Sequence, residues 1–132
     1  MREYKFRGKR LDNGEWVYGD LISNKNRTAI YDQSGLNNVG KDFISLTALR
    51  VDPSTVGQYT GFKDKNGKEI YEGDLVAVVD YANWEGLYKI IWDKENLTYM
   101  LEDAFGDREK LCEFEEYLVK GNIYEIPELL EV

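Results

Sequence analysis

Apolar and polar residues alternate with a period of two along most of this chain, and β-branched or aromatic residues cluster between turns of Gly, Asn and Asp. This alternation is typical of strands with one buried face. Asn13-Gly14 and Asn66-Gly67 each lie between segments of strand character. Because a type I′ turn needs positive φ at both central residues, each pair predicts such a turn and a hairpin. The second hairpin joins Phe62–Lys65 to Lys68–Tyr71.

A third hairpin and a central strand complete the β pattern. Segment Tyr88–Trp92, a turn at Asp93–Asn96 and segment Leu97–Glu102 predict the hairpin. Asp74–Val79 is apolar at both even and odd positions, which indicates a strand buried on both faces. We therefore expect a mainly β fold, a small antiparallel barrel-like domain built of hairpins.

The chain has 132 residues, a length that suits one compact core. No long Pro, Ser or Gly linker divides it, so we expect a single domain over residues 1–132. Residues 32–40 have the composition of an exposed loop.

Two segments resemble each other in sequence. Residues 11–22 and 64–76 both contain an Asn-Gly turn, a short strand that ends in Tyr, then Gly-Asp and an apolar pair. Glu72 is an extra residue in the second copy. The match fits either a duplicated hairpin unit or convergence of turn-rich segments. In both copies, Gly permits a tight bend and Asp is suited to bind nearby backbone amides.

Helical signal is confined to the C-terminal third. Leu111, Phe114 and Leu118 have helical spacing after a possible N-cap at Asp107, although Glu116–Tyr124 also has the pattern of a strand. We expect at most one short helix near 108–116. A C-terminal turn is expected at 127–130, where Pro127 suits a first helical position.

Composition excludes several kinds of chemistry. The chain has no histidine and one cysteine, so it contains neither an imidazole base or ligand nor an internal disulfide. It has no apolar run of membrane-spanning length and no apolar signal-peptide stretch at its start. We expect a soluble, cytoplasmic protein without membrane contact.

The remaining reactive groups predict no site. Cys112 has acidic neighbours that oppose thiolate formation. A calcium loop fails because Phe62 and Gly73 occupy its first and last ligand positions. The motifs of phosphate loops and serine hydrolases are absent. A magnesium site needs convergence of acids such as Asp103, Asp107 and Glu109, which spacing alone does not establish. We therefore expect no enzymatic activity, no catalytic or metal-binding residue and no cofactor.

Charge is unevenly distributed over the chain. Residues 1–66 hold 11 Lys and Arg against 8 Asp and Glu, a net of +3, whereas residues 67–132 hold 6 against 17, a net of −11. The acidic half fits a solvated surface, complementary contact between subunits, or a decoy that imitates nucleic acid and occupies a DNA-binding enzyme. One basic cluster alternates with the aromatic residues Tyr4 and Phe6; its members are Arg2, Lys5, Arg7, Lys9 and Arg10. This cluster fits an amphipathic strand or, as an alternative, single-strand nucleic-acid contact.

Aromatic residues are abundant: 10 Tyr, 5 Phe and 3 Trp. Most of them suit the interior of a small β protein, and the surplus of Tyr also suits an interface. We therefore expect a homo-oligomer that works through protein contacts, with another protein as a further partner.

The segment Val56–Val76, which contains Gly-Gln-Tyr-Thr-Gly-Phe-Lys-Asp-Lys-Asn-Gly, resembles the signature of the YopX family of phage and prophage proteins. Tyr4–Gly8 is similar to that family's opening strand, and Gly121–Leu130 is similar to its closing motif. One departure is Ile126, where the family commonly has Asn before the proline.

The resemblance implies a small β protein of Gram-positive phages or integrated elements that self-associates, with no assigned catalytic residue. It therefore transfers no catalytic role to the corresponding polar positions of the signature, which are Tyr59, Asp64, Tyr71, Glu72 and Asp74. From their residue types alone, we expect Gly61, Gly67 and Gly73 to give the backbone freedom that turns need, and Asp64 and Asp74 to cap those turns.

Overall fold

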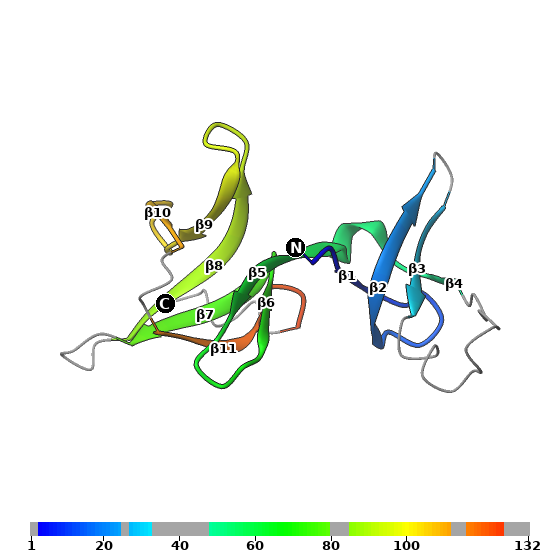
Figure 1. Ribbon diagram of the computed structural model, residues 1–132, viewed down its shortest axis with the longest axis horizontal. Helices are drawn as coiled ribbons and strands as arrows, with labels where there is room; N and C mark the ends of the chain where they lie inside the picture. The colour runs from blue at the N-terminus through cyan, green and yellow to red at the C-terminus, as the bar shows by residue number, and fades with distance from the viewer. Residues whose placement is uncertain (1–2, 25–26, 33–47, 80–84, 112–115, 126–132) are drawn as a thin grey trace. The chain divides into compact units, whose positions relative to one another are not determined.

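The computed structural model describes residues 3–24, 27–32, 48–79, 85–111 and 116–125 (Figure 1). Its elements, in chain order, are β1 (Phe6–Lys9), β2 (Trp16–Ser23), β3 (Thr28–Asp32), β4 (Ala48–Arg50), the 3₁₀ turn η2 (Pro53–Thr55), β5 (Gly57–Lys63), β6 (Glu69–Tyr71), β7 (Asp74–Val79), β8 (Glu85–Asp93), β9 (Thr98–Glu102), β10 (Arg108–Lys110) and β11 (Glu116–Asn122). The predicted mainly β fold is confirmed.

The strands form two antiparallel sheets. One has the order β4-β3-β2-β1-β5-β6 and the other the order β10-β9-β8-β7-β11. Neither sheet closes on itself among the described strands, so the barrel-like form expected from the sequence is wrong. Closure requires pairing of the two outermost strands of a sheet, and here both sheets keep open edges.

Contacts divide the chain into two compact units, residues 1–59 and residues 60–132. The boundary falls within β5, which pairs with β1 through Gly57 and Gln58 and continues toward β6. Each unit has its own core. The single domain expected from the length remains a prediction.

The first unit packs a small core under β1, β2 and β3. Its buried residues are Val17, Ile30 and Val51, against which Phe6, Leu21, Leu49 and Val56 pack. Gly8 lies on the core side of β1, where a Cβ atom would stand 3.0 Å from Val51 Cβ and 3.2 Å from Ile30 Cδ1. The close approach of these strands therefore requires glycine at position 8.

The second unit has the larger core, around β7 and β8. Its buried residues are Ile70, Val76, Ile90, Tyr99, Leu101 and Tyr117. β7 pairs with β8 on one side and β11 on the other. Its successive residues Leu75, Val76 and Ala77 are all at most 2% exposed. The prediction of a central strand buried on both faces is confirmed.

The turns at the two Asn-Gly pairs are not type I′. Gly14 and Gly67 have positive φ, 72° and 85°, as predicted for glycine, but Leu97 is the one described non-glycine residue with positive φ. At the second pair, Asp64 N–H binds Lys68 O, and Gly67 N–H binds Asp64 O. This is a three-residue loop in which a tight turn precedes a glycine in the left-handed region. The Asp64 carboxylate favours it by accepting backbone amides inside the loop.

The third predicted hairpin is confirmed. β8 pairs with β9 from Lys89–Glu102 to Asp93–Thr98, and the four residues between the last pair form the turn. Leu97 ends that turn with a φ of 54°.

The helix predicted near 108–116 is wrong over the described residues 108–111. Arg108–Lys110 forms β10, which pairs with Glu102, Leu101 and Met100 of β9. Asp107 closes a turn through its O atom, which accepts Asp103 N–H, rather than capping a helix. Pairing to an existing strand overrides the helical spacing here. The alternative strand in Glu116–Tyr124 is confirmed as β11.

The two similar segments adopt different structures. In the first, β2 runs without a break from Trp16 to Ser23. In the second, a turn at Glu72-Gly73 separates β6 from β7, and these two strands lie in different sheets. The extra residue Glu72 therefore accompanies a change of direction that the first copy lacks. The expected C-terminal turn at 127–130 and residues 33–40 of the expected loop lie outside the described residues.

Candidate functional site

Asp64 is the centre of the loop between β5 and β6. Its Oδ1 atom accepts the N–H groups of Asn66 and Lys68, each at 2.9 Å, and its Oδ2 atom accepts Val119 N–H at 3.2 Å. Desolvation raises the pKa of this carboxyl, but the three backbone donors outweigh it and the net pKa is lowered. The predicted capping role is confirmed, because both oxygens of the carboxylate accept backbone N–H groups.

Asp74 and Gly73 hold the turn between β6 and β7. Asp74 is 1% exposed, and its Oδ2 atom accepts Tyr71 N–H at 2.8 Å. Gly73 has a φ of 92°, and its N–H and O bind Ile90 and Ile123. The structural roles predicted for Gly73 and Asp74 are confirmed.

The other polar residues of the signature are also placed by the fold. Tyr59 and Tyr71 are buried, and the Tyr71 hydroxyl donates to Glu69 at 3.0 Å. Glu72 is half-buried, and desolvation raises the pKa of its carboxyl. Thr60 donates from its hydroxyl to Ile70 O at 2.8 Å, which ties β5 to β6 beside Gly61, whose φ is 90°.

The basic cluster of the first strand faces aromatic rings. The Arg7 guanidinium lies 4.8 Å from the centroid of the Trp16 ring, and the Lys9 ammonium lies 5.7 Å from the same ring. Lys5 lies 6.0 Å from the Tyr59 ring centroid. The even position Phe6 packs against the core instead. The strand is confirmed and its alternate residues Lys5, Arg7 and Lys9 share one side, but that side is not fully solvated because Arg7 is only 5% exposed.

Arg10, another member of that cluster, pairs with a carboxylate. Arg10 donates two hydrogen bonds to the Asp12 carboxylate, at 2.9 Å from Nε and 2.6 Å from Nη2. The Asp12 pKa is lowered chiefly by these bonds. Arg2 lies outside the described residues.

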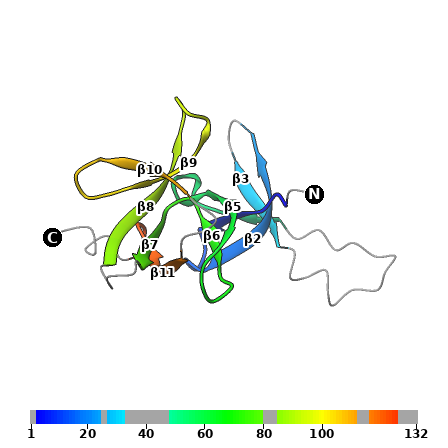
Figure 2. The same cartoon turned by 60° about the vertical axis from the view of Figure 1, so that its left-hand side comes forward.

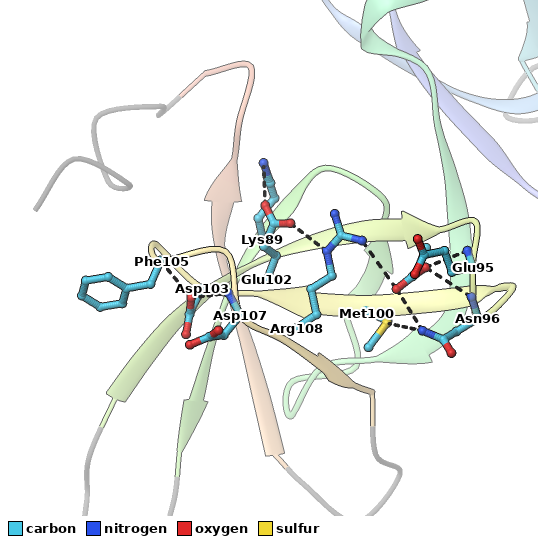
Figure 3. A network of polar contacts seen from close by, with 10 residues as sticks. Lys89, Glu95, Asn96, Met100, Glu102, Asp103, Phe105, Asp107 and Arg108 are labelled. Carbon is cyan, nitrogen blue, oxygen red and sulfur yellow. Dashed lines mark hydrogen bonds and ion pairs between the residues drawn. The ribbon is translucent and has the colours of Figure 1, made fainter.

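An ionic row crosses β8, β9 and β10 on one face (Figure 3). Lys89 pairs with Glu102 at 3.4 Å, and Glu102 also accepts Arg108 Nε at 3.0 Å. Arg108 in turn lies 3.5 Å from Asp93, which accepts the N–H groups of Glu95 and Asn96. The hydrogen bond to Glu102 chiefly raises the Arg108 pKa. These ion pairs link three strands, and each charged residue of the row has its partner within the row.

The acids considered for magnesium do not form a metal cluster. Asp103 Oδ1 accepts the N–H groups of Phe105 and Asp107, each at 2.9 Å, so this carboxylate caps its own turn. Glu109 is exposed on β10. Within the described ranges, no group of three acidic or cysteine side chains is placed to hold a metal ion. Cys112 lies outside them.

Two surface features have no counterpart among the sequence predictions. Phe105 is 92% exposed in the turn between β9 and β10, and its ring projects away from the strands (Figure 3). A surface cavity of about 430 Å³ in the first unit is lined by Arg10, Leu11, Asp12, Ala48, Leu49 and Arg50. A signal for Phe105 is present in Asp103-Ala-Phe-Gly-Asp107, where an aromatic residue stands inside a turn sequence. The cavity joins segments that are about 40 residues apart, which no local pattern reveals.

Comparison with known proteins agrees with the family resemblance of the signature segment. The family described as YopX protein matches residues 5–131, nearly the whole chain. This chain belongs to the YopX family. A search of curated proteins finds no match. Three chains of solved structures match.

One of these is the crystal structure of protein EF1440 from Enterococcus faecalis, with 26% sequence identity and a TM-score of 0.56. The alignment covers 98% of this YopX-family chain and 99% of that chain. The likeness therefore extends over both units. In the described part of the chain, no helix has the length and apolarity needed to cross a membrane.

Proposed function

We propose that this YopX-family chain is a non-enzymatic phage or prophage accessory protein that self-associates and acts through protein contacts in the host cytoplasm. Its phage origin is supported by membership of the YopX family. The signature segment resembles that of this family of phage and prophage proteins. The mode of action is argued from the surface of the chain.

The observation that carries the proposal is the set of large apolar side chains left exposed. In the first unit these are Tyr4, Leu11, Tyr18 and Ile22, and in the second unit they are Trp92, Leu97 and Phe105. Phe105 and Leu97 are the most exposed of them, at 92% and 73%. Exposed aromatic anchors of this kind are typical of surfaces that bind another protein.

The use of the acidic side chains supports a role without catalysis. Asp52, Asp64, Asp74, Asp93 and Asp103 each accept a backbone N–H of their own turn. Carboxylates engaged in this way hold loops in place, and the pKa values of Asp52, Asp64 and Asp93 are lowered because hydrogen bonds to the carboxylate favour the charged form. General acid catalysis needs the opposite, a carboxyl whose pKa lies near the working pH.

Light scattering of the full chain at micromolar concentration tests this proposal. We expect an average mass above that of the 15.4 kDa monomer at low salt, and a lower mass at about 1 M salt because charges contribute to the contact. A monomer under both conditions would overturn self-association. Binding of a single host or phage protein to immobilised chain then identifies the further partner.

A second candidate function is weak binding of single-stranded nucleic acid. The observation that favours it is the alternation of Lys5, Arg7 and Lys9 on one side of the segment that forms β1, where Arg7 and Lys9 pair with Tyr18 and Trp16 of β2. Cations beside aromatic rings suit a sequence-tolerant contact with phosphates and bases.

A gel shift with the double variant Lys5→Gln, Lys9→Gln tests the second candidate. Arg7 is left in place because it is 5% exposed and its removal endangers the fold. The matched control is Lys94→Gln, Lys110→Gln on exposed positions of the other unit. If the chain binds nucleic acid in this way, the complex weakens as salt is added. The Lys5→Gln, Lys9→Gln variant then binds more weakly than wild type, and the control variant binds as wild type does. Equal binding by both pairs, or none by wild type, removes this candidate.

A further inference from the structure

The turn that carries Phe105 has a close structural twin in the same chain. In both turns an Asp N–H binds the O atom four residues on, the Asp Oδ1 accepts two backbone N–H groups, and a glycine with positive φ stands at the fourth position. These glycines are Gly67 and Gly106, with φ of 85° and 87°. At the third position one turn has Asn66 and the other has Phe105. The turn itself therefore does not need an aromatic residue at that position.

Phe105 is also flanked by negative charge. Asp103 and Asp107 stand on either side of Ala104, Phe105 and Gly106, and the segment from Ala104 to Lys110 is exposed throughout. Figure 2 shows β9, β10 and their connecting turn as a separate hairpin at the edge of its sheet. The hairpin thus presents a bare phenyl ring on an acidic turn.

The cavity of the first unit has the complementary character. Its apolar lining comes from Leu11, Ala48 and Leu49, and it is flanked by Arg10 and Arg50. A backbone hydrogen bond of 3.1 Å from Leu11 N–H to Arg50 O holds the two lining segments together. Arg10 is neutralised by Asp12, while the Arg50 guanidinium has no hydrogen-bond or ion-pair partner within the described ranges. A volume of about 430 Å³ is ample for a phenyl ring.

We propose that the Phe105 ring of one copy binds in this cavity of a second copy, with Asp103 and Asp107 beside Arg10 and Arg50. This inference rests on the proposed function, because it names the surfaces through which the chain self-associates. Shape and charge select a second copy as the occupant: the cavity is apolar, with the exposed Arg50 and the Arg10–Asp12 pair at its rim, and the hairpin is an aromatic tip between two carboxylates.

The two surfaces are different, so their pairing has a consequence for symmetry. Each copy carries one hairpin and one cavity. A contact between two different surfaces is heterologous, and each copy can both present its hairpin and receive one. A variant that lacks the ring or the cavity therefore cannot form this contact with its own copies.

The test uses sedimentation equilibrium of the full chain and two interface variants. Phe105→Asn installs the residue that the twin turn carries and leaves the turn intact. Arg50→Glu reverses the charge at the cavity. We expect each to raise the dissociation constant of self-association at least tenfold, with unchanged melting temperature because both side chains are exposed.

Matched controls lie outside the proposed contact. Leu97→Asn removes the other highly exposed apolar side chain at a position whose positive φ Asn tolerates. Arg27→Glu reverses an exposed charge elsewhere in the first unit. We expect both controls to associate as wild type does.

Mixing the two interface variants gives the decisive measurement. The Arg50→Glu chain still carries Phe105, and the Phe105→Asn chain still carries an intact cavity, so a mixture regains one contact and forms a one-to-one complex. If the mixture stays monomeric while both variants are folded, the proposed pairing is wrong. If wild type self-associates but Phe105→Asn does so equally well, only this contact is wrong and self-association stands. If wild type is a monomer, both proposals fail.

Discussion

Val119 donates its backbone N–H to Asp64 Oδ2 at 3.2 Å, although the two residues are 55 positions apart in the sequence. Lys65 N–H binds Tyr117 O at 2.8 Å beside it. The loop between β5 and β6 therefore satisfies backbone groups of β11 at the outer edge of its sheet. Edge strands left bare are sites of unwanted pairing, so this contact protects the edge as well as holding the loop.

Replacement of Asp64 by Ala tests this bond network. The change leaves three backbone N–H groups without their acceptor, and we expect a loss of about 2 kcal/mol or more in the free energy of unfolding. Urea denaturation measures it. Asp107→Ala, at an exposed side chain, is the control and should change stability by no more than about 0.5 kcal/mol. Equal effects of the two would contradict the role given to Asp64.

The pH dependence of stability follows from the same carboxyl. Its pKa in the folded chain is lowered from the ordinary 3.8, so its contribution is fully present above 3.8 and is lost as pH falls through the lower folded value. We expect the stability difference between wild type and Asp64→Asn to be constant near neutral pH and to shrink below pH 3.8. Urea denaturation across this range measures it. A difference that grows on acidification would show that the carboxylate is not stabilised in the folded chain.

Two glycines of the signature differ in what surrounds them, and their Ala variants should differ accordingly. Gly67 has positive φ but open space where a Cβ atom would stand, so Gly67→Ala should cost about 1 kcal/mol through backbone strain. Gly73 has positive φ and a Tyr124 ring atom 3.0 Å from its Cβ position. Gly73→Ala should therefore cost more than Gly67→Ala in thermal or urea unfolding. If Gly67→Ala costs more stability than Gly73→Ala, the contact with Tyr124 does not add to the cost at position 73.

The core of the first unit provides a packing test at Gly8. A methyl group there meets Val51 Cβ at 3.0 Å, so Gly8→Ala should destabilise the chain by about 1–3 kcal/mol through overpacking. Val51→Ala removes the Cγ2 atom that would stand 3.1 Å from that methyl, although it keeps the Cβ atom at 3.0 Å, so it relieves part of the crowding. The double variant should therefore lose less stability than the two single variants added together, as measured in a double-mutant cycle. Strict additivity would show that the two positions do not meet.

Much of this fold was predictable from local sequence. Glycine turns, the hairpin at residues 88–102 and the buried strand 74–79 follow from residue types that act within a few positions. The capping roles of Asp64 and Asp74 are local in the same way.

The failures arise where partners are distant in sequence. Arg108–Lys110 forms a strand because β9 lies beside it, whereas its own spacing favours a helix. The type I′ turn was wrong because the Asp64 side chain redirects the loop. The cavity between Arg10 and Arg50 depends on the pairing of the residue after β1 with the segment after β4, and sequence spacing does not reveal such pairing.

Sedimentation equilibrium of the wild-type chain over a range of concentrations tests the central claim, self-association, most directly. The account predicts a mass that rises well above 15.4 kDa as concentration increases. Added salt screens the charged rim of the contact, so the same rise should then need a higher protein concentration. A mass of 15.4 kDa at every concentration and at low salt would contradict it.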